Sequence, residues 1–154
     1  MATHVIHRRL IQPETTPLYG ASSIRYAVPI GRVLFALIFL FAAPMHFSSQ
    51  SIQHAAAQGV PLASIAVPLS GVLALLGGLS VALGYQTRIG AWMLVLFLIP
   101  VTLMMHKFWG IADAQMAMMQ RIMFMKNVSI LGGALFLAYF GAGPVSIDEH
   151  TSAK

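Results

Sequence analysis

The sequence contains no cysteine and very little charge. Without cysteine, the chain can form no disulfide, no thiol nucleophile and no cysteine-ligated cluster. Charged residues make up 8% of its 154 residues and hydrophobic residues 58%, whereas soluble domains are about one quarter charged. A soluble domain of this size has too little interior to bury so much apolar surface. The composition therefore predicts a single-domain integral membrane protein.

The sequence also lacks the short motifs of common catalytic and nucleic-acid-binding sites. It has no HExxH, P-loop, GxGxxG or nucleophile-elbow pattern, and its nine Lys and Arg residues are scattered rather than interleaved with aromatic residues. No catalytic residue, metal site, covalent cofactor or nucleic-acid partner is therefore predicted.

Four apolar segments are present, each close to the ~20 residues that a membrane-spanning helix requires. They cover residues 28–47, 62–84, 88–106 and about 122–140. Residues 85–87 alone separate the second segment from the third, so these two helices must be antiparallel neighbours. The predicted fold class is an all-α membrane protein, an up-down-up-down bundle of four transmembrane helices. This bundle occupies residues 25–148, between a flexible cytoplasmic arm (1–24) and a C-terminal tail (149–154).

The distribution of Lys and Arg predicts how the bundle is oriented. If the amino terminus is cytoplasmic, that side collects six basic residues: Arg8, Arg9, Arg25, Arg32, Arg88 and Lys154. The opposite side holds three: Lys107, Arg121 and Lys126. Because cytoplasmic loops carry the excess of basic residues, both termini are predicted to be cytoplasmic. The bilayer, with its anionic lipids, is the first expected partner.

This topology brings polar residues from three helices to the extracytoplasmic end of the bundle. His46 ends the first span, His106 ends the third, and Arg121, Lys126 and Asn127 open the fourth. Polar and ionisable groups at the edge of a membrane span indicate a functional site. With the nearby tryptophan, the predicted ligand-binding residues are His46, His106, Trp109, Arg121, Lys126 and Asn127.

Each of these residues also has a purely structural interpretation. Trp109 suits the aromatic belt at a membrane interface, and Arg121 suits a side chain that snorkels to headgroups. Lys126 and Asn127 are the more specific pair because they lie more than a turn inside the span. Asp113 is expected to be a partner for Lys126, a solvated loop residue or a helix cap. At the other end, Arg32 is predicted either to contact lipid or to reach Asp148.

Methionine is concentrated near the same extracytoplasmic end. Eight of the ten methionines lie there: Met45, Met104, Met105, Met116, Met118, Met119, Met123 and Met125. Flexible thioether walls with His, Lys or Asn donors suit a hydrophobic, oxygen-bearing ligand such as a quinone. Thioethers and imidazoles also suit Cu(I), although the methionines do not follow a dedicated MxxM pattern.

Several segments together resemble the DoxX family of small four-helix bacterial inner-membrane proteins. They are Gly31-Arg32, residues 71–92 (GVLALLGGLSVALGYQTRIGAW), HKFW at 106–109, FMKN at 124–127 and GAGPVSID at 141–148. The resemblance covers about residues 25–148. It implies a plasma-membrane bundle, relatives linked to thiosulfate:quinone oxidoreductase, and others in complexes with superoxide-detoxifying and sulfurtransferase partners.

Two functions stay open at this stage. The first is a quinone-associated role in redox chemistry through the extracytoplasmic residues, with membrane or soluble redox proteins as partners. The second is a non-catalytic membrane anchor or assembly subunit of a redox or detoxification complex, which includes association with further copies of the chain. A transporter is disfavoured because the spans show no internal repeat and carry no charge at the bilayer midplane.

Overall fold

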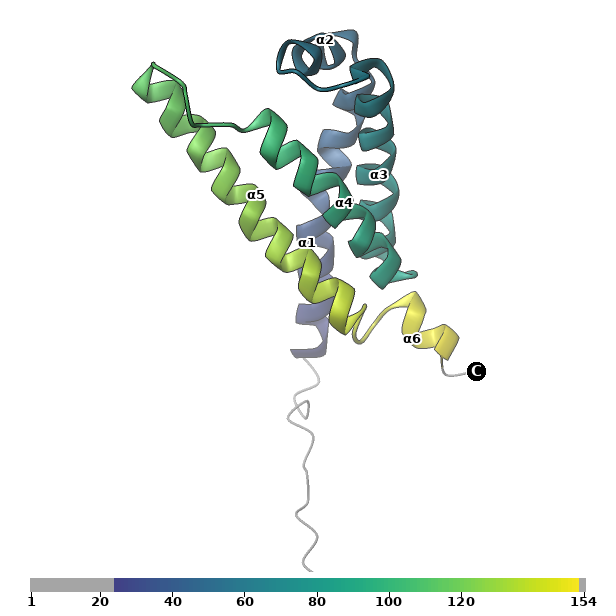
Figure 1. Cartoon of the computed structure of the whole chain (residues 1–154). Coiled ribbons are helices and arrows are strands. Elements are labelled where there is room, and N and C mark those ends of the chain that lie inside the picture. Colours follow the sequence, from purple (N-terminus) through teal and green to yellow (C-terminus); the bar gives the residue numbers. More distant parts are fainter. Residues whose placement is uncertain (1–23, 153–154) are drawn as a thin grey trace, which may run out of the picture.

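The computed structural model describes residues 24–152, and these are largely helical (Figure 1). The predicted arm, residues 1–24, lies outside the described residues except for Ile24. In chain order the elements are the 3-10 helix η1 (Ile24–Tyr26), α1 (Ala27–Ala42), the 3-10 helix η2 (Ala43–Phe47), α2 (Ser49–Ala57), α3 (Ala63–Leu83), α4 (Thr87–Met105), α5 (Ala114–Phe140) and α6 (Ile147–Ser152). The short helix α6 runs across the predicted boundary between residues 148 and 149.

The long helices confirm the predicted fold class. In the described part of the chain, four segments are long and apolar enough to cross a membrane: Ile24–Phe47, Ala63–Leu83, Thr87–Met105 and Ala114–Phe140. Their directions alternate along the chain, so α2 lies at one end of the bundle and α6 at the other (Figure 1). These are called the α2 end and the α6 end below.

Glycines at the helix crossings allow α3 to pack closely between α1 and α4. A Cβ atom added to Gly77 would lie 2.9 Å from the carbonyl oxygen of Gly90 on α4, and one added to Gly90 would lie 2.2 Å from Ser80 Oγ. On the other side of α3, a Cβ at Gly78 would lie 3.0 Å from Leu40 Cδ2 of α1. Neither crossing has room for a larger side chain. Small residues at such crossings let helix backbones approach closely, which is how helices associate in lipid.

Helix α5 packs along α4 and begins earlier than the sequence predicted. It starts at Ala114, about two turns before residue 122. Asp113 explains this start, because its Oδ1 accepts a hydrogen bond from the backbone N–H of Met116 at 2.7 Å and so caps the helix. Of the roles predicted for Asp113, the structure shows the helix cap. The first turns of α5 stand away from α2 and α3 (Figure 1).

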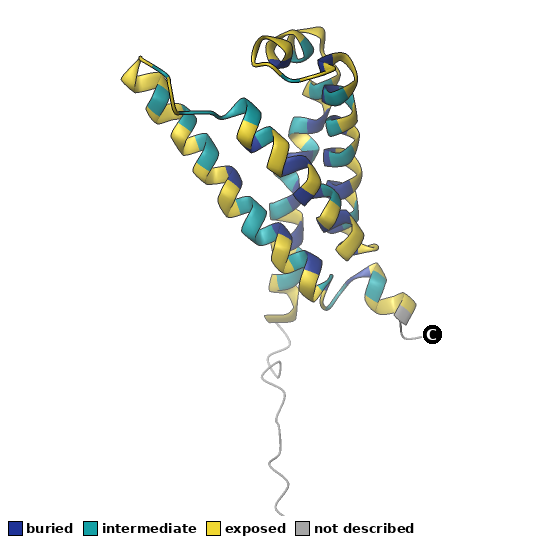
Figure 2. Cartoon of the chain, in the orientation of Figure 1, coloured by how far each residue is buried: buried dark blue, intermediate teal, exposed yellow. Residues whose placement is uncertain are grey.

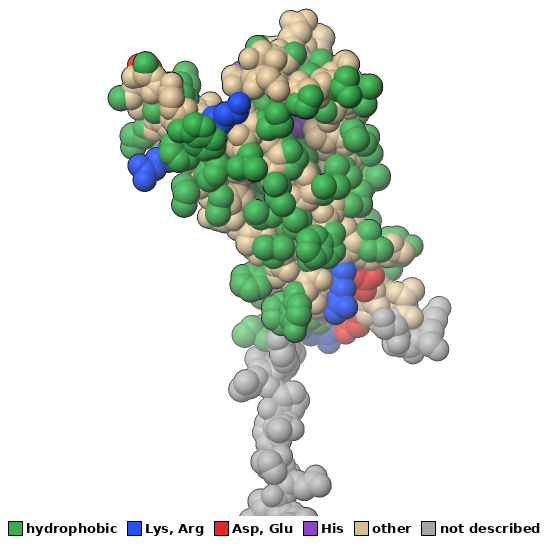
Figure 3. All heavy atoms as spheres, viewed as in Figure 1, with side chains coloured by type: hydrophobic (Ala, Val, Ile, Leu, Met, Phe, Trp, Pro, Cys, Tyr) green, Lys and Arg blue, Asp and Glu red, His purple; other side chains and the backbone are tan. Residues whose placement is uncertain are grey.

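Buried residues gather where the helices face one another, while the outer flanks are apolar and exposed (Figures 2 and 3). Phe41, Phe136 and Phe140 are among the most exposed side chains, at 76%, 68% and 70%. Such residues are costly in water but are solvated by lipid chains, while the backbone polar groups are satisfied inside the helices. The chain is an integral membrane protein.

Candidate functional site

A cavity of about 1230 Å³ opens at the α2 end, where α1 and α4 end and α3 begins. Its walls combine polar groups with methionine and other apolar side chains: Ala42, Met45, His46, Ser48, Gln50, Ser51, Gln53, His54, Ala55, Val60, Pro61, Ala66, Val67, Ser70, Pro100, Val101, Met104, Met105, His106 and Gln120. Small-molecule sites have this composition, a mostly apolar wall with a few placed polar groups.

Helix α2 forms part of the cavity wall because the loop after α1 is helical. Ser48 begins this helix, and its Oγ accepts a hydrogen bond from Ser51 N at 3.2 Å. Gln50 and His54 lie on one face of α2, since residues four apart in a helix are neighbours. Both side chains line the cavity.

His46 enters the cavity wall from η2, the 3-10 helix that follows α1. Pro44 stands at the start of η2, where the α-helical hydrogen bonding of α1 gives way to a tighter turn. His46 Nδ1 lies 2.9 Å from Ser70 Oγ, which itself donates to the carbonyl oxygen of Val67 at 2.6 Å. Because the serine proton is directed at Val67, His46 Nδ1 carries a proton and donates it to Ser70. The imidazole also packs against Phe97, with ring centroids 5.5 Å apart.

His106 lines the same cavity from the end of α4. Its Nδ1 lies 3.0 Å from Gln120 Oε1 on α5. An amide oxygen only accepts, so Nδ1 of His106 is also the protonated nitrogen. Among the described residues, no hydrogen-bond partner holds the Nε2 atom of either histidine. Each ring therefore has one nitrogen fixed by the protein and one left for a ligand.

The structure brings two of the six predicted site residues, His46 and His106, to this cavity. Lys126 and Arg121 are exposed on α5 and lie outside the cavity lining. Asn127 is buried, with 6% of its surface exposed, yet it also lies outside the lining.

Trp109 is likewise outside the cavity wall and belongs to a separate aromatic cluster. Its ring centroid lies 5.2 Å from that of Phe108 and 6.0 Å from that of Phe124. Phe108 and Phe124 are themselves 5.5 Å apart. This cluster ties the α4–α5 loop to α5, and Trp109 remains 53% exposed, which suits an aromatic belt.

Ser70 and Gln120 are the site residues that sequence reasoning missed. Each orients a predicted histidine, but neither carries a distinctive motif. Gln120 is separated from His106 by a loop, and nothing in the sequence indicated that the two side chains meet. Ser70 could have been found as a polar position in the first turns of an apolar span, on the same side of the membrane as His46.

At the α6 end, Arg32 holds the segment between α5 and α6. The side chain is buried, with 3% of its surface exposed. Its guanidinium donates hydrogen bonds to the carbonyl oxygens of Ala142, Pro144 (3.4 Å) and Val145 (2.7 Å). Of the two roles predicted for Arg32, a lipid contact or a structural partner, the structure shows the structural one, with backbone carbonyls as the acceptors. We refer to Arg32 and residues 142–145 as the Arg32 latch.

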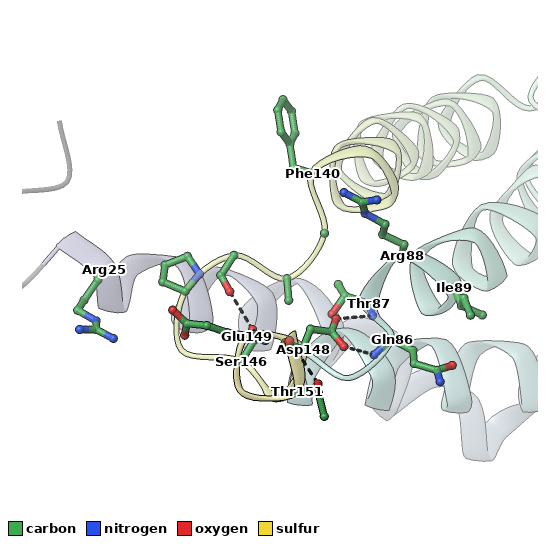
Figure 4. A pocket seen from close by; sticks show the side chains of 14 residues that line it. Arg25, Gln86, Thr87, Arg88, Ile89, Phe140, Ser146, Asp148, Glu149 and Thr151 are labelled. Carbon is green, nitrogen blue, oxygen red and sulfur yellow. Dashed lines mark hydrogen bonds between the residues drawn. The ribbon is translucent and has the colours of Figure 1, made fainter. Parts of the chain in front are cut away.

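Asp148 completes this end by capping α4 from the far end of the chain. Its Oδ1 accepts from Gln86 N at 2.6 Å and its Oδ2 from Thr87 N at 3.0 Å (Figure 4). Burial acts to raise the pKa of Asp148, but these amides together with the positive charge of Arg32 hold it below its ordinary value. Arg32 thus influences Asp148 through its charge, while its hydrogen bonds go to the loop carbonyls.

Comparison with known proteins finds relatives over most of the chain. The sequence model of the SURF4 family matches residues 20–153. Inner membrane protein YphA of Escherichia coli is 32% identical over 121 residues, covering 79% of this chain and 85% of YphA. Inner membrane protein YqjF of the same species is 31% identical over 129 residues, covering 82% and 93%. ER-derived vesicles protein ERV29 of Saccharomyces cerevisiae is 32% identical over 78 residues, which is 51% of this chain and 25% of ERV29. No solved structure matches the chain.

These matches overturn the assignment to the DoxX family, because the family whose model matches is SURF4. The motifs that suggested DoxX contain residues that hold the helices together. Gly77 and Gly90 lie at a helix crossing, and Arg32 bonds to the segment that precedes α6. Those contacts serve the four-helix architecture, so they identify the fold and do not single out one family. The chain belongs to the SURF4 family.

Proposed function

We propose that this membrane protein binds a lipid-soluble, oxygen-bearing molecule such as a quinone in the cavity at the α2 end. The observation that carries the proposal is the shared arrangement of His46 and His106. Each ring uses Nδ1 for a protein partner and leaves Nε2 unpartnered at the same cavity. A protonated Nε2 donates to a carbonyl oxygen, and a neutral Nε2 accepts from a hydroxyl group.

The apolar part of the cavity suits the rest of such a ligand. Met45, Met104 and Met105 provide flexible, polarizable walls that adapt to a ring or an isoprenoid chain. A volume of about 1230 Å³ exceeds the range of typical drug-sized sites, roughly 300–1,000 Å³, and leaves room for part of a lipid tail. Redox chemistry, where it occurs, is supplied by the ligand and by partner proteins.

The proposal includes the location of the chain. YphA and YqjF are named as inner membrane proteins, and we assign the same membrane here. The excess of Lys and Arg on the α6 side supports both termini being cytoplasmic, with the cavity facing the extracytoplasmic side.

The test is direct measurement of bound ligand. Protein purified in mild detergent is extracted for mass spectrometry of its lipids, then titrated with ubiquinone and menaquinone analogues that carry a photoreactive group. We expect saturable labelling of peptides that line the cavity, and loss of labelling in His106→Ala. Lys126→Ala is the matched control, since Lys126 is exposed outside the cavity and its loss should leave labelling unchanged.

Two outcomes would overturn the quinone assignment. One is labelling of His106→Ala equal to that of the wild-type protein while Tm is unchanged. The other is labelling spread over the lipid-facing surface of α5 with no saturation. If His106→Ala fails to fold, His46→Gln serves as a second variant of the cavity. Glutamine at this position keeps a hydrogen-bonding group against Ser70.

A second function, as a membrane assembly subunit, is favoured by the surface of α5. Only Asn127, Ala134 and Ala138 of this 27-residue helix are buried. The relative ERV29 is named as an ER-derived vesicles protein. In an assembly role, the contact face of this chain would be α5. Gly132 is the position to test, because a Cβ there meets nothing within 4 Å. Gly132→Leu should disrupt a co-purifying partner or a second copy without disturbing the bundle.

Gly133→Leu is its matched control for folding. A Cβ at Gly133 would lie 2.9 Å from Phe35 Cε2 of α1. Loss of a partner with Gly133→Leu alone would therefore report damage to the bundle, and would count against α5 as a docking face.

A further inference from the structure

Two histidines at the α2-end cavity present hydrogen-bond acceptors, and this determines which kind of ligand oxygen they can bind. A neutral histidine that donates the proton of Nδ1 to a partner has no proton on Nε2. His46 donates from Nδ1 to Ser70 Oγ at 2.9 Å, and His106 donates from Nδ1 to Gln120 Oε1 at 3.0 Å. The Nε2 atom of each neutral ring is therefore an acceptor at the cavity.

Two serine hydroxyl groups of the cavity wall have their protons engaged by the protein as well. Ser70 Oγ donates to the carbonyl oxygen of Val67 at 2.6 Å. Ser48 Oγ lies 2.9 Å both from the carbonyl oxygen of Met45 and from Ser51 Oγ, and donates to one of them. Because a hydroxyl group has a single proton, a ligand that reaches either serine oxygen meets only its lone pairs.

The composition of the cavity wall favours the neutral form of both imidazoles. Among the described residues that line the cavity there is no Asp or Glu, and a neighbouring carboxylate is the group that would stabilise an imidazolium ion. The other polar side chains of the wall can each either donate or accept a hydrogen bond: Gln50, Ser51, Gln53, His54 and the amide of Gln120. These groups serve a donor and an acceptor alike, so discrimination between ligands rests on the two histidines.

The reduced and oxidised forms of a quinone differ at the atoms that such histidines contact. The two forms share their ring and their isoprenoid tail, so the apolar walls bind them about equally. The quinone has carbonyl oxygens, which only accept hydrogen bonds, whereas the quinol has hydroxyl groups, which can donate them. A carbonyl oxygen placed against a neutral Nε2 pairs two acceptors and leaves both unsatisfied, while a hydroxyl group forms a hydrogen bond there.

We propose that the α2-end cavity selects the hydroxyl-bearing, reduced form of its ligand, a quinol, over the carbonyl-bearing quinone. This selection rests on the proposed function, in which a lipid-soluble molecule of this class binds there. One histidine within reach of the ligand is sufficient, because His46 and His106 each present the same acceptor independently. The selection is a binding preference without electron transfer, and the hydroxyl proton stays on the ligand.

The first experiment compares a short-chain ubiquinol with the matching ubiquinone. Each is titrated without oxygen into the full chain in detergent, in mildly alkaline buffer where imidazoles are neutral. We expect the quinol to bind about tenfold more tightly, because it forms a hydrogen bond where the quinone leaves two acceptors unpaired. The dimethyl ether of the quinol has the same ring and tail but no donor, so it should bind as weakly as the quinone.

Ser70→Ala tests whether the tautomer of His46 causes this preference. Without the serine acceptor, the imidazole proton can move to Nε2, and the ratio of quinol to quinone affinity should fall about threefold. Ser129→Ala is the matched control and should leave the ratio unchanged. Ser129 Oγ makes a similar bond to a backbone carbonyl, that of Met125 at 3.0 Å, but it lies on α5 outside the cavity lining.

The second experiment measures the tautomers without any ligand. Nitrogen NMR of protein isotopically labelled at histidine distinguishes protonated from unprotonated ring nitrogens, and His46→Gln and His106→Gln identify the two sets of signals. We expect Nδ1 to carry the proton and Nε2 to be unprotonated in both rings.

The outcomes separate this proposal from the proposed function. Saturable binding of ubiquinone as tight as that of ubiquinol would overturn the selection and leave the ligand site in place. A proton on Nε2 of both rings in the ligand-free protein would do the same. No saturable binding of either form would overturn the ligand site itself, and the selection with it. If Ser70→Ala fails to fold, the comparison of ubiquinol with its dimethyl ether on the wild-type protein decides the proposal.

Discussion

The two ends of the helix bundle use their polar residues in opposite ways. At the α6 end, Arg32 and Asp148 bond to backbone groups of other segments and tie α1, α4 and the residues before α6 together. At the α2 end, His46 and His106 each give one ring nitrogen to a side-chain partner and keep the other unpartnered at a cavity. The comparison teaches that a polar residue near a membrane edge is structural or functional according to which of its atoms the protein already holds.

Arg32→Ala should cause the largest loss of stability, because it removes the Arg32 latch. Three carbonyl groups would lose charge-assisted hydrogen bonds, and the buried site would keep unsatisfied acceptors. We expect a loss of about 4 kcal/mol, since hydrogen bonds to charged groups contribute about 1.5–3 kcal/mol each and are not additive. Thermal unfolding in detergent measures it, with Arg121→Ala as the control. A Tm within a degree or so of wild type would show that the latch is not a structural joint.

Gly84→Ala compares the two ends directly, because Gly59 at the α2 end provides a matched glycine. Both have positive φ, +67° and +83°. A Cβ at Gly84 would lie 2.6 Å from Ser146 Cβ, whereas nothing lies within 4 Å of one at Gly59. We expect a loss of about 3 kcal/mol for Gly84→Ala, from backbone strain and overpacking, and about 1 kcal/mol for Gly59→Ala, from strain alone. Equal Tm shifts for the two variants would contradict this difference between the ends.

Asp148→Ala should cost about 1 kcal/mol at neutral pH, the usual value of a helix cap. Because the pKa of Asp148 is lower in the folded protein than in the unfolded chain, its stabilisation is present above the unfolded pKa of about 3.9 and is lost as the pH falls through the folded pKa. The Tm difference between wild type and variant should therefore shrink below pH of about 4. A Tm difference that grows as the pH falls would contradict a lowered pKa of Asp148 in the folded protein.

Gln120→Ala at the α2 end should have the smallest effect on stability, within about 0.5 kcal/mol. It removes the acceptor of the His106 Nδ1 proton at 3.0 Å, but the ring lies at an open cavity where water can replace it. The effect should instead appear as weaker photolabelling by a quinone analogue, because His106 loses the partner that fixes its tautomer. A stability loss as large as that of Arg32→Ala would make the α2 end a structural joint as well.

The fold followed from sequence because the controlling signal is long and local. Each span needs about 20 apolar residues, and the tight connection at residues 85–87 forces α3 and α4 to be neighbours. The meeting of His46 and His106 followed from the same reasoning, since alternating helices place those two ends on one side. The DoxX assignment failed because small residues and the latch segment report the architecture rather than the family.

What the sequence did not provide was the direction of individual side chains. Helix α5 is apolar nearly all round, so no stripe indicates which face holds Lys126 and which holds Asn127. The structure leaves Lys126 exposed and buries Asn127. The acceptors of Arg32 were also invisible, because backbone carbonyls have no side-chain signature. Only the path of residues 142–145 brings them to the guanidinium.

The Arg32 latch also has a consequence for the order in which the protein is made. Arg32 belongs to the first span, while the carbonyl of Ala142 that it binds lies 110 residues later in the chain. During synthesis the first span therefore precedes the carbonyl groups that hold its arginine in the folded protein, and an unbonded cation costs free energy at a membrane. Residues 142–145 relieve that cost once they have been made. We therefore expect the bundle to close only after residues 142–145 have been synthesised, and a product truncated before them to keep Arg32 without these acceptors.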